Sequence, residues 1–327
     1  MTDSDSSVQE LARRLRAGER RALARAITLV ESARVEDDRR AALLMSELLP
    51  HTGGALRIGV SGAPGVGKST FIEAFGMHLV KLGHRVAVLA IDPSSALSGG
   101  SILGDKTRMP ELSASDRVFV RPSPSGGSLG GVAQRTREAA LLCEAAGYDI
   151  VLIETVGVGQ SEFAVAHMTD TFLLLALAGA GDELQGIKRG IFELIDLLAI
   201  TKADGENVSA AERARAEYAS ALRLLHQGLR GTVPEVLCVS AVEQRGIETV
   251  WSQIERAVER ARASGAFDAK RAAQRRAWFS ECVEQELHRR FFARPGVPER
   301  FSGLQAQVFQ GDLLPREAAR QLLNDAI

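Results

Sequence analysis

The sequence predicts an α/β fold in which helices cover both faces of a mostly parallel sheet. Between residues 56 and about 241, seven apolar runs of strand length alternate with amphipathic helical patterns. Several of these runs are nearly continuous Val, Ile and Leu, as expected for parallel strands that are buried on both faces. A glycine-rich loop follows the first run. The expected strands are 56–61, 85–91, 117–120, 149–154, 171–176, 196–201 and 236–240.

Helical patterns flank this alternation on both sides, so we expect three regions. Residues 1–53 carry leucines at helical spacing on Arg/Glu-rich faces and form an N-terminal helical region. Residues 54–262 form the domain that contains the sheet. Residues 263–327 carry interrupted apolar stripes and form a C-terminal helical extension. A chain of 327 residues exceeds the size at which one hydrophobic core usually stops growing, which agrees with such a division.

The composition is that of an ordinary globular protein. Hydrophobic residues make up 45%, charged residues 25%, and the formal net charge is −1, so the overall charge does not favour nucleic acid or an anionic membrane as a partner. No run approaches ~18 uninterrupted apolar residues, and the first residues lack the apolar core of a signal peptide. Cys143, Cys238 and Cys282 have no metal or redox spacing. We therefore expect a cytoplasmic protein that binds neither nucleic acid nor membrane.

The glycine-rich loop matches the P-loop pattern, which is a glycine, four residues, and then Gly-Lys-Ser. A strand that feeds such a loop into a helix places several backbone N–H groups around one concavity, at the positive end of the helix dipole. Lys68 would reach the β- and γ-phosphates, and the Ser69 hydroxyl would ligate Mg²⁺. The residues expected to contact a nucleoside triphosphate here are Gly62, Pro64, Gly65, Val66, Gly67, Lys68, Ser69 and Thr70.

Two segments at strand ends indicate that the base is guanine. Residues 201–204 read Thr-Lys-Ala-Asp, where GTPases usually carry Asn-Lys-x-Asp. Asp204 would accept hydrogen bonds from the guanine N1–H and exocyclic amine, and the stem of Lys202 would cover the base face. Thr201 replaces the asparagine that normally ties this loop to the P-loop, which leaves the strength of guanine binding open. The second segment, whose backbone would meet the guanine oxygen, is Ser240, Ala241 and Val242.

Carboxylates at two other strand ends are candidates for the metal site. Glu154 ends a buried apolar run and is followed three residues later by Gly157. The Glu154 carboxylate would hold Mg²⁺ through water, and the Gly157 N–H would meet the γ-phosphate. Asp92 ends the second expected strand and is another candidate for the metal. Alternatively, the Asp92 side chain caps the turn before Pro93.

The segment Glu154-Thr-Val-Gly157 carries glutamate where ordinary GTPases carry aspartate. With this exchange the chain resembles the MeaB/ArgK branch of the P-loop GTPases, which are associated with methylmalonyl-CoA mutase and related acyl-CoA mutases. The resemblance covers roughly residues 10–260. The stretches that carry it are 17–27, 90–95, 98–109, 121–125 with Gly130-Gly131, 154–162 and 179–188.

The resemblance implies a homodimer that binds GTP or GDP with Mg²⁺ and hydrolyses GTP. It further implies a chaperone that gates delivery of adenosylcobalamin to a cobalamin-dependent acyl-CoA mutase, and removal of damaged cofactor. Adenosylcobalamin belongs to the mutase, whose cobalamin-binding domain is the expected contact. Dimerisation through residues 263–327 rests on this likeness together with their apolar stripes. The client stays open among the methylmalonyl-, isobutyryl-, ethylmalonyl- and hydroxyisobutyryl-CoA mutases.

Two further loops are expected to move during the GTPase cycle. Residues 99–109 are glycine-bearing, polar and charged, and would carry Asp105 toward the metal and γ-phosphate. Residues 179–188 follow a buried strand, and in this family that loop is taken to couple the mutase to the GTP site. We predict that Lys188, steered by Asp182, is recruited to the phosphates as a surrogate arginine finger when the mutase docks. The alternative is a solvated helix N-terminus whose dipole Asp182 stabilises.

Two other functions fit parts of the sequence. A metal-insertion GTPase for nickel or zinc enzymes would share the fold and Glu154, but it would be expected to carry Cys/His metal relays, which this sequence lacks. An ATP-dependent kinase of a small molecule or transport protein is an older label for the family. It would transfer phosphate to an acceptor other than water, and residues 201–204 argue for guanine instead. Intrinsic hydrolysis is expected to be slow, since no in-cis arginine finger is evident.

Overall fold

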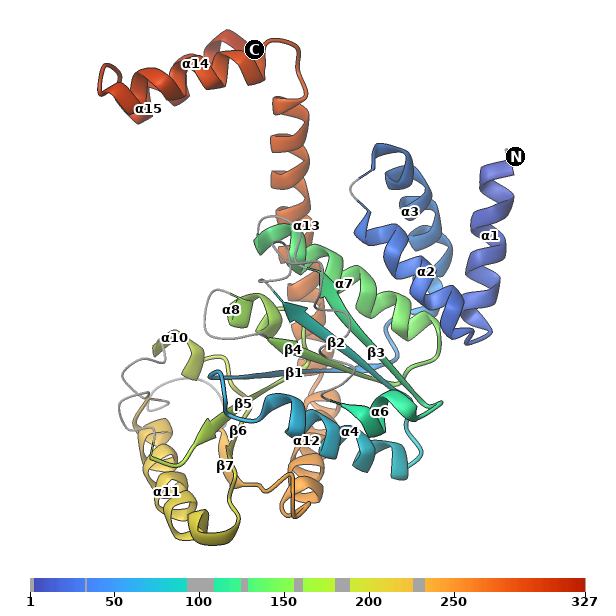
Figure 1. Cartoon of the computed structure of the whole chain (residues 1–327), viewed down its shortest axis with the longest axis vertical. Coiled ribbons are helices and arrows are strands. Elements are labelled where there is room, and N and C mark those ends of the chain that lie inside the picture. The colour runs from blue at the N-terminus through green and yellow to red at the C-terminus, as the bar shows by residue number, and fades with distance from the viewer. Residues whose placement is uncertain are drawn as a thin grey trace. The chain divides into compact units, whose positions relative to one another are not determined.

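The computed structural model contains a sheet of seven parallel strands in the order β3-β2-β4-β1-β5-β6-β7 (Figure 1). Every strand that the sequence predicts is present, within a few residues of its expected bounds. The predicted α/β fold is therefore confirmed, and all neighbouring pairs of these strands are parallel. The strands are β1 Leu56–Gly62, β2 Val86–Asp92, β3 Val118–Pro124, β4 Ile150–Thr155, β5 Thr171–Leu177, β6 Leu197–Thr201 and β7 Glu235–Cys238.

The structure describes residues 3–32, 34–92, 109–124, 129–155, 161–179, 189–225 and 233–326. The chain forms two compact units, Met1–Arg271 and Ala272–Ile327. No helix of the described residues is long and apolar enough to cross a bilayer. The helices are α1 Asp3–Arg16, α2 Arg20–Glu31, α3 Val35–Leu48, η1 Leu49–His51, α4 Lys68–Lys81, α6 Pro110–Ala114, α7 Leu129–Ala145, α8 Ser161–Ala166, α10 Arg189–Phe192, η2 Gly205–Asn207, α11 Val208–Leu225, α12 Ile247–Ala263, α13 Ala266–Phe292, α14 Val297–Gln310 and α15 Pro315–Ala326.

The apolar strand residues supply a core on each face of the sheet, because successive side chains of a strand point to opposite faces. In β4, Ile150 and Leu152 pack in one cluster with side chains of α4, α6 and α12. Val151 and Ile153 pack in the other cluster, with side chains of α7, α8, α10 and α11. Helices therefore cover both faces, which explains why this strand reads as a continuous apolar run.

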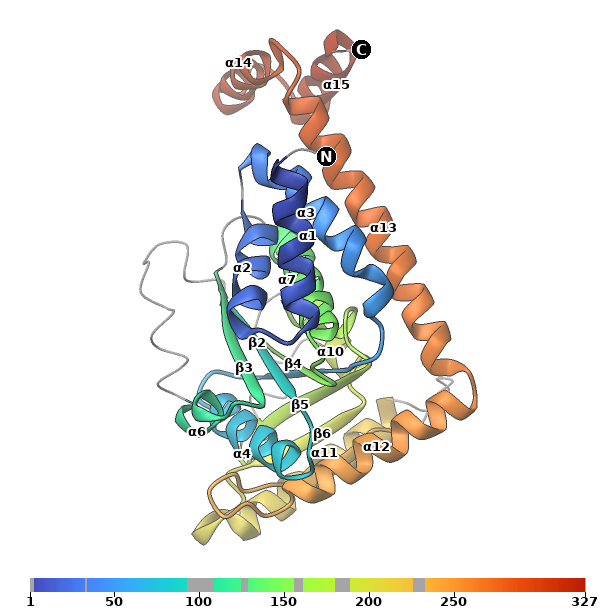
Figure 2. The same ribbon diagram turned by 90° about the vertical axis from the view of Figure 1, so that its right-hand side faces the viewer.

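The N-terminal helices extend the second of these clusters rather than forming a core of their own. Leu15, Leu23 and Leu44, one from each of α1, α2 and α3, are fully buried in the same cluster as Leu142 of α7. Figure 2 shows α1, α2 and α3 grouped beside α7, away from α4 and α12. The N-terminal helical region thus belongs to the unit that contains the sheet.

Arg271 fastens the beginning of α13 to the amino edge of the sheet. Its Nε and Nη2 donate to the two carboxylate oxygens of Asp170 at 2.7 Å each. Two further bonds go to the carbonyl oxygens of Gly53 and Ala55, at 2.5 and 2.6 Å. Asp170 also accepts the backbone N–H of Arg57 at 2.8 Å. The paired side chains are only 8% and 1% exposed, so this ion pair is buried and fully hydrogen-bonded.

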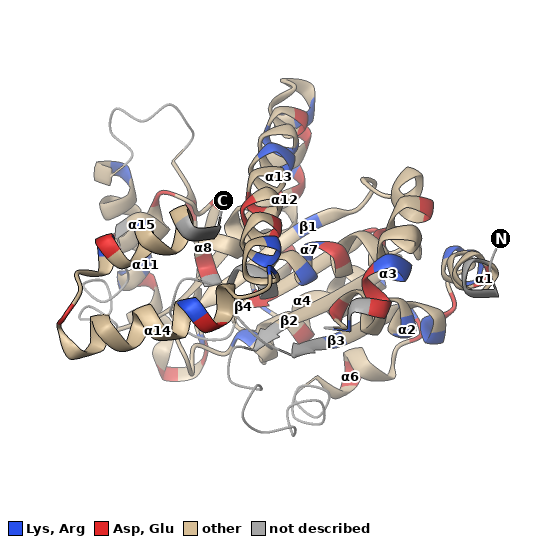
Figure 3. Ribbon diagram, turned by 90° about the horizontal axis from the view of Figure 1, so that it is seen from above, with Lys and Arg blue, Asp and Glu red and all other residues tan. Residues whose placement is uncertain are grey.

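The second unit has a small core of its own, formed by Val297, Leu304, Ala318 and Leu322. Other apolar side chains of this unit stay exposed, including Phe279 at 70% and Phe309 at 92%. Both basic and acidic residues lie along α12 and α13 (Figure 3). This mixture of signs is typical of a solvated helix surface rather than of a single-sign patch.

We expect Asp170→Asn to destabilise the protein strongly, because it leaves the buried Arg271 guanidinium without its counter-charge. Breaking such a pair costs about 3–5 kcal/mol. Urea unfolding measures the change in the free energy of unfolding. The matched control is Glu10→Gln, which removes an exposed pair with Arg13 and should change the stability far less, because solvent screens exposed pairs. Equal losses in the two variants would contradict the role assigned to the buried pair.

Candidate nucleotide-binding site

The P-loop leaves the carboxyl end of β1 and begins α4. Gly62 ends β1 where an added Cβ would lie 2.6 Å from the carbonyl oxygen of Leu175 in β5, so a larger residue does not fit. Gly67 precedes α4 with φ of +94°, a left-handed conformation that favours glycine. These two glycines let the chain turn directly from strand to helix, which brings the N-terminus of α4 to the carboxyl edge of the sheet. A helix N-terminus at this edge is suited to bind phosphate.

Lys68 lies inside the turn of this loop. Its Nζ donates to the carbonyl oxygens of Gly62 and Ala63 at 2.7 and 3.1 Å. Burial lowers the pKa of the Lys68 ammonium from its ordinary value, while the carboxylates of Glu154 and Glu162 oppose this shift. The ammonium is therefore held among oxygen acceptors, at the place where a P-loop lysine meets phosphate oxygens.

Ser69 and Glu154, the two residues expected to share the metal, lie together. The Ser69 hydroxyl donates to Oε1 of Glu154 at 3.3 Å, and Glu154 is 5% exposed. The neighbouring Thr155 donates to Oγ of Ser61 at 2.9 Å, which ties β4 to β1 at this level. A hydroxyl and a carboxylate oxygen are the hard donors that Mg²⁺ prefers, and this ion keeps several waters and phosphate oxygens as its other ligands. The donor set therefore fits Mg²⁺.

The other expected ligands are described only in part. Asp92 is the last residue of β2, and Ala90, two residues before it, is the register partner of Glu154 in β4. Asp105, Gly157, Asp182 and Lys188 lie outside the described residues, so their roles stay predictions. Among the described residues no group of three or more His, Cys, Asp or Glu side chains could hold a metal ion.

Thr201 connects the base loop to the P-loop, the role that an asparagine usually has at this position. Its hydroxyl lies 2.7 Å from the carbonyl oxygen of Val66 and 3.2 Å from that of Ala176, and it donates chiefly to the nearer one. Thr201 is 5% exposed, so this bond is shielded from water. This hydrogen bond therefore ties the base loop to the P-loop, between two residues that lie 135 positions apart in the sequence.

The remaining residues of the expected base site surround Asp204. Ser240 donates from Oγ to Oδ2 of Asp204 at 2.5 Å, which fixes the carboxylate. Lys202 has φ of +53°, and its Cε lies 3.9 Å from the position of a Cβ at Gly67, so its stem runs beside the P-loop. Next to Ser240, Ala241 is half-buried and Val242 is 82% exposed. A base seated here would have Asp204 at its edge and Lys202 at its face.

One functional candidate was not identified from the sequence. Glu162, in the first turn of α8, is 1% exposed, and its charge acts on Lys68. The sequence placed Glu162 only as the last residue of the stretch 154–162. Nothing in that local pattern signals that the chain folds back toward Lys68.

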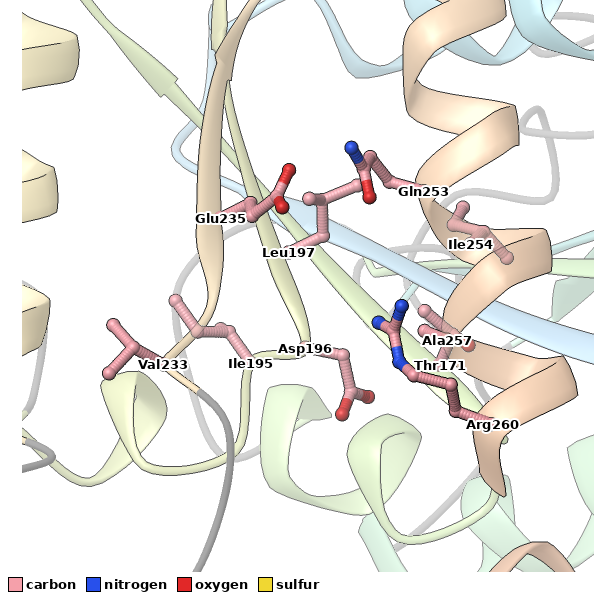
Figure 4. Close-up of a pocket in the computed structure, with 10 residues that line it drawn as sticks. All are labelled: Thr171, Ile195, Asp196, Leu197, Val233, Glu235, Gln253, Ile254, Ala257 and Arg260. Atoms are coloured by element: carbon pink, nitrogen blue, oxygen red, sulfur yellow. The ribbon is translucent and has the colours of Figure 1, made fainter. Parts of the chain in front are cut away.

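A separate pocket of ≈ 360 Å³ lies at the opposite edge of the sheet (Figure 4). Its wall includes Thr171, Leu197 and Glu235, which are the first residues of β5, β6 and β7. Gln253 and Arg260 of α12 face them from the other side. Because the strands are parallel, the starts of these strands lie away from the loop that follows the end of β1. The pocket is therefore not part of the P-loop site.

Comparison with known proteins gives close, nearly full-length relatives. The family model described as Methylmalonyl Co-A mutase-associated GTPase MeaB matches residues 23–296. A putative GTPase of Caulobacter vibrioides is 52% identical over 97% of each chain. GTPase ArgK of Escherichia coli is 47% identical over 98% of this chain and 96% of its own.

Two further relatives carry other names. The mitochondrial methylmalonic aciduria type A homolog of Mus musculus is 48% identical over 94% of this chain and 76% of its own. Among solved structures, the crystal structure of an LAO/AO transport system kinase has a TM-score of 0.77 and 40% identity. It covers 99% of this chain and 98% of its own.

We expect Thr201→Val to weaken GDP binding ~10-fold, because the variant keeps the shape but leaves the buried Val66 carbonyl without its donor. Titration calorimetry with GDP and Mg²⁺ measures the dissociation constant. The control is Thr169→Val, which removes a hydroxyl that donates to the carbonyl of Val165 at 2.9 Å. If both variants bind GDP as the wild type does, the Thr201 bond does not position the base loop.

We expect Ser69→Ala to abolish most of the gain in nucleotide affinity that Mg²⁺ provides, since the metal loses a ligand. Nucleotide affinity is measured with Mg²⁺ and again with a chelator. The variant and the wild type should differ with the metal and agree without it. A loss of the same size in the chelator would assign Ser69 to the phosphates or to folding instead.

Proposed function

Since the chain belongs to the family of methylmalonyl-CoA mutase-associated GTPases and is a GTPase, we propose that its GTP cycle gates the delivery of adenosylcobalamin to a cobalamin-dependent acyl-CoA mutase. The same cycle would protect or reactivate the mutase by removing damaged cofactor. The observation that carries the nucleotide part of this proposal is the hydrogen bond by which Thr201 joins the 201–204 loop to the P-loop, and the mutase part is supported by the family. The Thr201 bond would hold the loop for the guanine base and the loop for the phosphates in a fixed position relative to each other.

The roles within the site follow from the donors and acceptors present. The backbone of residues 62–70 and the Lys68 ammonium would bind the phosphates, and Asp204 and Lys202 would bind guanine. Ser69 and Glu154 would hold Mg²⁺, which when bound neutralises charge on the β- and γ-phosphates. Asp92 and Asp105 are proposed as further groups at the metal. The Gly157 N–H is proposed to meet the γ-phosphate.

The role proposed for the coupling loop is supported by the position of β5, the strand that precedes it. β5 lies next to β1, and Leu175 of β5 pairs with Gly62 of the P-loop. The strand that precedes residues 180–188 therefore ends beside the P-loop. A cation supplied from this loop would stabilise charge that develops on the γ-phosphate during hydrolysis. We assign that role to Lys188, steered by Asp182, when the mutase is bound.

A homodimer is part of the proposal. The second unit exposes apolar side chains on successive helices, among them Phe279 and Leu287 of α13, Phe309 of α14 and Leu314 before α15. Apolar surface of this kind is buried favourably against a partner. A second copy of this unit is the occupant we propose, as the apolar stripes of the sequence suggest.

A kinase function is the second candidate, because a solved relative with 40% identity is described as an LAO/AO transport system kinase. It predicts transfer of the γ-phosphate to a protein or small molecule rather than to water. Release of inorganic phosphate in equal amount to the GTP consumed, with no labelled acceptor, would exclude it. Equal affinity for GTP and ATP would exclude the guanine-specific site.

The test of the coupling role uses purified methylmalonyl-CoA mutase and measures phosphate release with and without it. We expect the mutase to stimulate hydrolysis by the wild type, and Lys188→Ala to lose the stimulated rate by ~10²-fold. Basal hydrolysis and GDP affinity should not change. The control is Lys81→Ala, an exposed lysine in the last turn of α4. Normal stimulation of Lys188→Ala, or loading of adenosylcobalamin that is the same with GTP and GDP, would refute the proposal.

A further inference from the structure

We propose that Arg245 is a positioning residue for guanine recognition: its guanidinium holds the loop of Lys202 to Asp204 in the conformation that presents Asp204 to the base. The inference rests on the proposed guanine site and adds a residue that lies outside the two recognition segments. It is carried by the hydrogen bonds that join residues 201–204 to residues 239–246.

The first set of bonds attaches the base loop to the end of the neighbouring chain segment. Val239 donates its N–H to the carbonyl of Ile200 at 2.8 Å, and Ala203 donates its N–H to the carbonyl of Val239 at 3.1 Å. The Ser240 hydroxyl holds the Asp204 carboxylate at 2.5 Å. These bonds fix the Ala203 N–H and the Asp204 carboxylate. The carbonyl oxygen of Ala203, which lies between them in the chain, accepts none of these bonds.

The second set of bonds folds residues 240–246 into a closed loop. Ser240 and Arg245 form an antiparallel bridge, in which the Ser240 N–H donates to the Arg245 carbonyl at 2.9 Å. The Glu243 N–H donates to Oγ of Ser240 at 3.0 Å. Gly246 has φ of +79°, and an added Cβ would lie 2.4 Å from the carbonyl oxygen of Cys238, so the chain can close here only with glycine. The closed loop brings Arg245 beside the base loop.

The Arg245 side chain then completes the set. Its Nη2 donates to the carbonyl oxygen of Ala203, a residue that is 2% exposed. This carbonyl belongs to the peptide between Ala203 and Asp204. Ala203 is thus held at both its N–H and its carbonyl, and the Asp204 carboxylate is held by Ser240. A hydrogen bond from a charged donor is stronger than one between neutral groups.

The conformation that Arg245 holds is one that the chain would not keep unaided. Lys202 has φ of +53°, a left-handed conformation that is unfavourable for residues with a Cβ and persists only where neighbours enforce it. Lys202 and Asp204 flank Ala203, so releasing its carbonyl would loosen both residues that meet the base. Arg245 also pairs with Glu243, at 3.6 Å. Both side chains of that pair are about half exposed, at 50% and 47%, so it contributes little.

The test compares Arg245→Ala, Arg245→Lys and the control Glu243→Gln in the full-length protein. Dissociation constants are measured for GDP and for inosine diphosphate, which lacks the exocyclic amine that Asp204 would accept. We expect Arg245→Ala to bind GDP ~10-fold more weakly, with a smaller loss for inosine diphosphate, so that the preference for GDP falls. Lysine should restore part of the preference, and Glu243→Gln should keep all of it. The rate of GTP hydrolysis at saturation should not change.

Three outcomes would overturn the inference: unchanged GDP affinity in Arg245→Ala, equal losses for the two diphosphates, or the same loss in Glu243→Gln. If Arg245→Ala does not fold, Arg245→Gln replaces it, and a structure of this variant shows whether the new glutamine reaches the Ala203 carbonyl. If the glutamine does not reach it and the variant still keeps the full preference for GDP, the role assigned to Arg245 is wrong. A wild type that binds ADP as well as GDP would refute the guanine site itself, which is a different result from any of these.

Discussion

The position of β1 between β4 and β5 is the constraint on which the site depends. In a parallel sheet the carboxyl ends of neighbouring strands emerge at the same edge. The register pairs Gly62 of β1 with Leu175 of β5, and Val60 of β1 with Glu154 of β4. The P-loop, Glu154 and the strand end that precedes the proposed coupling loop therefore start from adjacent strands. A slip of one residue in either pair would turn these side chains to the other face.

The candidate site contains two kinds of residue: those proposed to contact the ligand, and those that hold the contacting residues in position. Lys202 and Asp204 are the proposed contacts of the base, and Thr201, Ser240 and Arg245 hold the loop that carries them. Each of these three makes its bond to a segment distant in sequence, to Val66, Asp204 and Ala203 respectively. Such a loop loses less conformational entropy when it binds, because folding has already ordered it.

Local sequence patterns predicted the fold well, for reasons that lie in short-range chemistry. The glycines of the P-loop are spaced by the geometry of one turn, and continuous apolar runs identify strands covered on both faces. The 3.3 Å approach of Ser69 to Glu154 also requires β4 to lie beside β1, a strand order that the sequence did not predict. The same patterns gave no indication of Glu162 or Arg245. Their contacts depend on where the chain returns after a helix or a closed loop, and no local spacing records that distance.

Sequence by itself determined that this chain forms a parallel α/β sheet with a P-loop, since each of these features is written within a few neighbouring positions. Tertiary structure alone decided how threonine serves at position 201 in place of the usual asparagine. Only the packed sheet brings the Thr201 hydroxyl to 2.7 Å from the Val66 carbonyl oxygen. It likewise decided that Arg271 closes the amino edge through Asp170. A hydrogen bond requires atoms within about 3 Å of one another, and between segments far apart in the chain only the complete fold supplies that proximity.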